Sequence, residues 1–241
     1  MQAPQGRIDG SLVADASQPE PPVALELQSP AFGLDPMLQA AGLPGGSDGV
    51  VELDVALSTA GRSLAALMAK LNGHAGLAMV NGNVSNAALG AALGNLLPKA
   101  ARLDTGGSSA VRCLALRLDA KDGQAAVAAL ELDTSRLELA GSGAINLAGE
   151  TLALRLRPTV RVGGTGILAP ARMEGSLAHP VIALDSQGVE GRSGIVIGGP
   201  PPPDGCAAAL TVARDGHAGP MPGPAVVKST KPADLLRSFL R

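Results

Sequence analysis

The stretch TLALRLRPTVRV, residues 151–162, decides the expected fold. Its even positions are apolar, and arginine, threonine or alanine stands between them. A period of two is typical of a β-strand with one apolar face and one polar face. The alternating apolar residues are Leu152, Leu154, Leu156, Val160 and Val162.

The same alternation continues outward from this stretch. It recurs at residues 51–57, 114–118, 130–132 and 137–147, and it dominates from Val23 to Asp185. Turn-forming triplets at residues 121–123, 133–135 and 148–150 have the short spacing of antiparallel neighbours. We predict a mostly β chain whose antiparallel β-meander covers residues 111–162. Within it, Gly141 and Gly143 indicate a bulge or bend.

Two segments change to a helical period. Ser63 can cap a helix whose apolar residues recur at i, i+3, i+4 and i+7 before Gly73 ends it. The second helix is expected from about Asn86 to Leu97, with Pro98 as the stop. Both are short and amphipathic, so each is expected to lie against a sheet.

Composition changes after Asp185. We predict a β-rich domain over residues 1–186, a Gly/Pro-rich linker over 187–230 and a short amphipathic helix over 231–241. A tail of this kind should be dispensable for folding.

The overall composition excludes one class of function. The chain has no Trp, no Tyr and only two Phe, and its 19 basic and 21 acidic residues are scattered. Nucleic-acid binding is not expected, because neither a basic patch nor stacking aromatics are available. Any core must be built from Leu, Val, Ile and Ala.

One string has the form of a catalytic motif. Residues 45–49 match the G-x-S-x-G of hydrolase nucleophile elbows, with Ser47 at the centre. That elbow requires a strand before the serine and a helix after it, whereas here a loop precedes and a strand follows. We predict a polar loop and no enzymatic activity.

Histidines and cysteines give no metal or haem signature. His74, His179 and His217 lack ligand spacing, so no cofactor and no metal are expected. Cys113 and Cys206 could form a disulfide, but two free thiols are the favoured prediction, because nothing in the sequence pairs them.

Three pieces of sequence resemble the C-terminal region of the AsmA family. They are residues 61–76, which include Gly61-Arg62-Ser63-Leu64; residues 132–158, with a G-x-G-x-I-x-L core at 141–147; and residues 171–185. The best match covers residues 61–185. The resemblance implies an inner-membrane anchored periplasmic protein, with strands curled into an apolar groove that passes phospholipid toward the outer membrane. It implies no catalytic residues.

The resemblance also implies that more of the protein exists. No basic and apolar leader follows Met1, and no window reaches about 20 apolar residues. We therefore expect a fragment whose membrane anchor lies in a missing N-terminal part. An envelope protein that binds the C-terminal helix is a further expected partner.

The expected groove wall is a set of aliphatic residues on one sheet face. Burying an acyl chain there gains about 0.8 kcal/mol per CH₂. The alternative is that the same face packs against the helices as a closed core, leaving a structural module whose tail docks a partner. The candidate wall residues are Leu137, Leu139, Ile145, Leu147, Leu152, Leu154 and Leu156.

Overall fold

The computed structural model describes residues 6–93, 106–162, 165–185, 196–197 and 204–223. Within these ranges 13 strands join into one sheet, and every pairing is antiparallel. The strands are β1 (Asp9–Ala14), β2 (Pro22–Gly33), β3 (Val50–Ala60), β4 (Asn72–Val80), β5 (Asn83–Ser85), β6 (Ser108–Lys121), β7 (Gln124–Thr134), β8 (Leu137–Asn146), β9 (Thr151–Val162), β10 (Thr165–Leu168), β11 (Ala171–Ser176), β12 (Pro180–Leu184) and β13 (Val196–Ile197).

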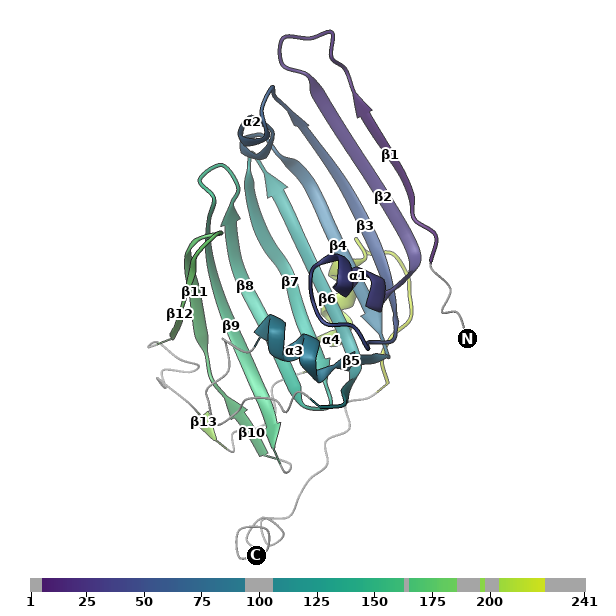
Figure 1. Cartoon of the computed structure of the whole chain (residues 1–241), viewed down its shortest axis with the longest axis vertical. Helices are drawn as coiled ribbons and strands as arrows, with labels where there is room; N and C mark the ends of the chain where they lie inside the picture. Colours follow the sequence, from purple (N-terminus) through teal and green to yellow (C-terminus); the bar gives the residue numbers. More distant parts are fainter. Residues whose placement is uncertain (1–5, 94–105, 163–164, 186–195, 198–203, 224–241) are drawn as a thin grey trace, which may run out of the picture.

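The strands follow chain order almost without exception (Figure 1). Along the sheet the order is β1-β2-β3-β4-β6-β7-β8-β9-β10-β13, with β5 added beside β6 and β12 beside β11. One part of β9 pairs with β10 and the other with β11. The sheet is open and does not close into a barrel, which confirms the predicted mostly β fold class.

The predicted meander over residues 111–162 is confirmed, since β6, β7, β8 and β9 are consecutive neighbours. Asp122 and Gly123 both have positive φ, 48° and 72°, as a tight hairpin turn requires. The predicted irregularity at Gly141 and Gly143 is also present. Gly143 has φ 136°, and the pairing of β8 with β7 is interrupted beside it.

Both predicted helices are present in the described residues. Ser63 caps α2 (Leu64–Ala69) by accepting a hydrogen bond from the Ala66 N–H at 3.2 Å. The second helix, α3 (Asn86–Leu93), begins as predicted, and the rest of the predicted range lies outside the described residues. A third helix, α1 (Leu34–Ala40), was missed because it has barely two turns.

Helices cover both faces of the sheet. Met79 packs in a cluster with residues of α1 and α3, whereas its neighbour Ala78 packs with α4 (Cys206–Ala213). Successive strand residues point to opposite faces. Therefore α1 and α3 lie on one face, called the apolar face below, and α4 lies on the other, the polar face.

The linker predicted over residues 187–230 is wrong for the part that contains α4. This helix buries Cys206 and Leu210 completely against β4 and β6, and Cys206 forms a disulfide with Cys113. The expectation of free thiols is therefore wrong as well. Alanine is too small to signal a packed helix in sequence, but it suits close packing on Ala78 and Ala115. The helix predicted over 231–241 lies outside the described residues.

Breaking the disulfide should destabilise the fold, contrary to the expectation of a dispensable tail. The two cysteines are 93 residues apart, so their link restricts the unfolded chain strongly. We expect the double variant Cys113→Ser, Cys206→Ser to lose about 2–5 kcal/mol of unfolding free energy in urea titrations. A reducing agent should bring the parent protein to the same level and leave the double variant unchanged. Equal stability of the oxidised parent and the variant would contradict this role.

Candidate functional site

The apolar face carries one continuous set of aliphatic side chains across the sheet. The antiparallel register brings them together pair by pair, for example Leu25 with Leu57, Leu118 with Val127, and Ile145 with Leu152. All of them are half-buried. We call this set the apolar strip; its members are Leu25, Val55, Leu57, Ala75, Leu118, Val127, Ile145, Leu152 and Leu154.

One end of the apolar face is sealed. There α1 and α3 lie over the sheet (Figure 1), and Leu34 and Leu89 are buried against Val51 and Met79. Leu93 of α3 also contacts Leu137, which has no exposed surface. This end is an ordinary hydrophobic core.

The predicted wall residues divide between the two ends. Leu137, Leu139 and Leu156 are buried in the sealed end. Ile145, Leu152 and Leu154 belong to the half-buried strip. Leu147 lies in the turn after β8 and is not part of the strand wall. The closed-core alternative therefore holds for the end of the face that contains Leu137, Leu139 and Leu156.

Ser47 has a structural environment. Its Oγ accepts a hydrogen bond from the Ser85 N–H at 3.0 Å, and its own N–H donates to Asp35 Oδ1 at 2.9 Å. Ser85 Oγ in turn accepts from the Ala88 N–H in the first turn of α3. The serine thus ties the loop before β3 to the start of α3.

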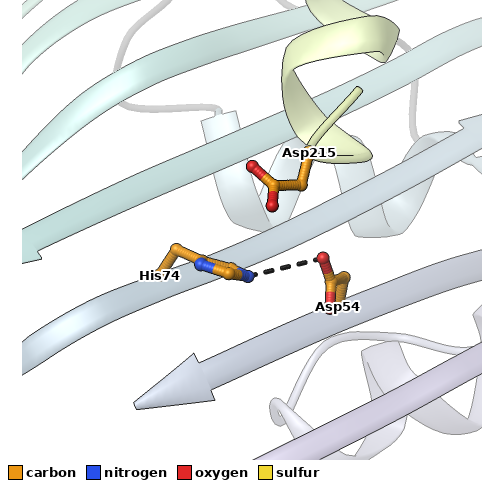
Figure 2. A group of neighbouring side chains, drawn as sticks. All are labelled: Asp54, His74 and Asp215. Carbon is orange, nitrogen blue, oxygen red and sulfur yellow. Dashed lines mark ion pairs between the residues drawn. The ribbon is translucent and has the colours of Figure 1, made fainter. Parts of the chain in front are cut away.

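On the polar face, ion pairs hold the C-terminal end of α4. Arg214 is 4% exposed and donates two hydrogen bonds to Glu52 of β3, at 2.8 and 2.7 Å. Arg117 of β6 donates to Asp215 at 3.0 Å. Asp215 also lies near Asp54 and His74, as Figure 2 shows.

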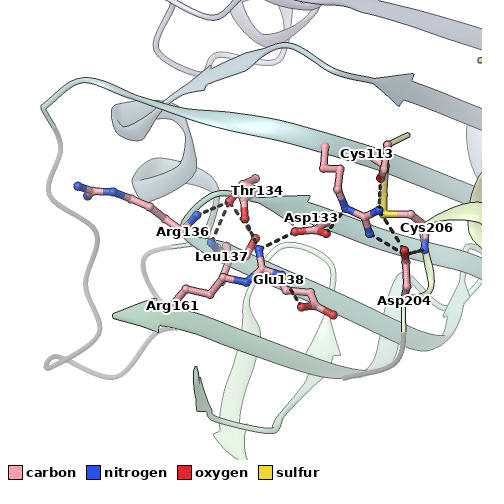
Figure 3. Close-up of polar contacts among 11 residues, drawn as sticks. Cys113, Asp133, Thr134, Arg136, Leu137, Glu138, Arg161, Asp204 and Cys206 are labelled. Atoms are coloured by element: carbon pink, nitrogen blue, oxygen red, sulfur yellow. Dashed lines mark hydrogen bonds and ion pairs between the residues drawn. A yellow bond between two sulfur atoms is a disulfide. The ribbon is translucent and has the colours of Figure 1, made fainter. Parts of the chain in front are cut away.

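A second network holds the N-terminal end of α4 (Figure 3). Arg112 pairs with Asp204 and with Asp133, each at 2.6 Å. Arg161 of β9 pairs with the same Asp133 at 2.6 Å and with Glu138 at 2.8 Å. The network thus joins the start of α4 to four consecutive strands, β6 to β9.

Glu131 of β7 lies beside this network, and its carboxyl group has a strongly raised pKa. Burial raises its pKa to about 7, and the negative charges of Glu138, Asp133 and Asp204 add to the shift, whereas Arg112 opposes it. Burial also raises the pKa of Glu138, and Arg161 offsets part of that rise. The carboxylate of Glu131 lies close beneath Gly205, at the start of α4.

Comparison with known proteins assigns the family. The family model described as AsmA family matches residues 3–130, more than half of the chain. The chain belongs to the AsmA family. The matched residues run from before β1 into β7, so two of the three pieces that carried the resemblance, 132–158 and 171–185, lie beyond the match.

AsmA membership supports a role related to cell-envelope biogenesis and lipid transport. No curated protein and no solved structure matches the chain. None of the described helices is both long enough and apolar enough to cross a membrane.

Sequence reasoning missed the polar network entirely. Arg112, Asp133 and Asp204 meet through sheet pairing and through the packing of α4 on the sheet, so no local spacing indicates them. The same is true of Cys113 and Cys206. The one feature of the sequence that indicated a disulfide was the even number of cysteines.

The free energy of unfolding should fall as pH rises through Glu131's titration. Its folded pKa of about 7 lies above the ordinary value of 4.5, so between these values the folded state holds more protons than the unfolded state. Stability from this group is complete below about pH 4.5 and is lost as pH rises through about 7.

Glu131→Gln keeps the side-chain shape and removes this titration. We expect the pH slope of the unfolding free energy in urea to shrink, by at most about 1.4 kcal/mol per pH unit. Glu26→Gln, at an exposed position of β2, is the matched control and should leave the slope unchanged. An unaltered slope in Glu131→Gln would contradict the assignment.

Proposed function

We propose that this AsmA-family chain handles phospholipid without catalysing a reaction, holding acyl chains on the apolar strip between the inner and outer membranes. The observation that carries the proposal is the strip itself. Its aliphatic side chains are only half-buried, so apolar surface on this face remains in contact with solvent. They continue across seven neighbouring strands, from β2 to β9.

The dimensions of the strip suit an acyl chain. Strands about 4.8 Å apart give the strip a width of roughly 29 Å across the sheet. One leaflet of a bilayer has a hydrocarbon thickness of about 15 Å, so a single acyl chain fits within the strip. Each CH₂ removed from water contributes about 0.8 kcal/mol. A shallow apolar trough therefore suffices for reversible binding.

The disulfide supports a location outside the cytosol. Disulfides persist in oxidising compartments such as the bacterial periplasm, and Cys113 pairs with Cys206. A periplasmic module attached to the inner membrane through another part of the protein agrees with this chemistry. The envelope partner expected at residues 231–241 remains part of the proposal.

The test compares one charge at the two ends of the apolar face. Leu152→Asp puts a carboxylate in the half-buried strip, where solvent can reach it, so the protein should fold and lose bound lipid. Leu137→Asp puts the same carboxylate in the sealed end and should cost about 3 kcal/mol or more, because a buried charge has no partner there. Lipid extraction with mass spectrometry and thermal melting by circular dichroism measure the two effects.

Ala153→Asp is the matched control, since Ala153 is exposed on the polar face of the same strand. It should retain both stability and bound lipid. A folded Leu152→Asp protein with undiminished phospholipid would exclude the strip as the binding site. Absence of phospholipid from the parent protein would favour the closed structural module.

A further inference from the structure

Three side chains from distant parts of the sequence meet on the polar face. Asp54 comes from β3, His74 from β4, and Asp215 follows the last residues of α4 (Figure 2). One ligand atom of each lies within 4.8 Å of the other two. Histidine nitrogen and carboxylate oxygen are the ligands of many zinc sites.

Local packing explains how Asp215 reaches the sheet. Gly76 of β4 lies beneath the end of α4, and a Cβ at this position would collide with the Ala213 carbonyl oxygen. The missing side chain lets the helix end approach β4 closely. Asp215 then adopts a left-handed backbone, with φ 54°, which turns the chain directly above β3 and β4.

The histidine contributes the observation that points to a ligand. His74 Nε2 is buried and makes no hydrogen bond among the described residues, and its contact is the ion pair with Asp54 drawn in Figure 2. It lies 3.4 Å from Asp54 Oδ2. Two atoms that each lie about 2.0–2.1 Å from a tetrahedral zinc ion are about 3.4 Å apart. The nitrogen and the oxygen already have the separation of two zinc ligands.

We propose that Asp54, His74 and Asp215 bind a zinc ion. Asp215 is half-exposed, and a shift of its side chain by roughly 1.4 Å would bring the three ligand atoms to the separations found around one shared zinc ion. The mixed nitrogen and oxygen set suits zinc better than magnesium or calcium, which select oxygen ligands. Three protein ligands leave a fourth position for water.

Neighbouring groups are compatible with the ion. Arg117 bonds Asp215 through Oδ1 and also pairs with Asp119 at 2.7 Å, so Asp215 Oδ2 is left for the metal. Hydrogen bonds of this kind hold ligating carboxylates in place. A pocket of about 310 Å³ adjoins Asp215 on the side of Arg117 and Thr211, so solvent reaches this carboxylate.

Zinc at this position has a structural consequence. The disulfide joins the first residue of α4 to β6, whereas the zinc site joins the turn after α4 to β3 and β4. The ion would therefore add a further attachment of the C-terminal end of α4 to the sheet, beside the Arg214–Glu52 and Arg117–Asp215 pairs. It follows that zinc should raise the thermal stability of the folded chain.

The experiment uses the full chain with its disulfide intact, after a chelator has removed any bound metal. Zinc chloride is titrated into the protein by calorimetry, and thermal melts are recorded with and without zinc. We expect saturable binding of one zinc per chain and a rise in the melting temperature. Co²⁺ in place of zinc should give the visible absorption of a tetrahedral site. Asp215→Asn, which tolerates the left-handed backbone, and His74→Gln should each weaken zinc binding roughly tenfold or more.

His179→Ala is the matched control, because His179 is exposed in the turn between β11 and β12 and should bind zinc no differently from the parent. The proposal is overturned if the parent shows no saturable zinc binding. It is also overturned if Asp215→Asn and His74→Gln, each folded by circular dichroism, bind zinc as tightly as His179→Ala.

Discussion

The antiparallel register of the long strands is the constraint on which the other features depend. Leu25 lies opposite Leu57, Leu77 opposite Leu116, and Leu132 opposite Leu139. Side chains alternate between the faces, so a slip of one residue would move leucines to the polar face and, in β6 and β9, arginines to the apolar face. The register therefore creates both faces at once, and with them the strip, the sealed core and the ion-pair networks.

Small side chains shape how α4 covers the sheet, in a chain with only two phenylalanines and no tryptophan or tyrosine. Buried positions beneath α4 are held by alanine and cysteine, including Ala78, Ala115 and Cys113, and these leave room for a helix backbone to lie close to the strands. Small residues contribute little burial energy individually. The disulfide and the ion pairs at both ends of α4 therefore hold this helix on the sheet, because a core of small side chains does so only weakly.

Those ion pairs occupy different environments and should not be weighed equally. Arg214, which pairs with Glu52, and Asp133, which pairs with Arg161, are almost fully buried. Removing Glu52 or Arg161 would therefore leave a buried charge with one ion-pair partner fewer. Pairs such as Arg7 with Asp9 are exposed and contribute little. The buried pairs fix the positions of both ends of α4 on the sheet. Their net contribution to the free energy of unfolding is small, because the cost of removing the charges from water offsets the attraction between them.

Local periodicity in the sequence was enough to predict the strands of the meander, the starts of α2 and α3 and the leucine face. Leu152 and Leu154 could be assigned to one face from alternation alone. Tertiary structure decided which leucines are sealed, since Leu137 and Leu152 have the same pattern in sequence and differ only because α3 covers one of them. It also decided the disulfide and the group formed by Asp54, His74 and Asp215. The disulfide joins residues 93 positions apart, and Asp215 reaches Asp54 and His74 from the far end of the described chain, so no local rule specifies these contacts.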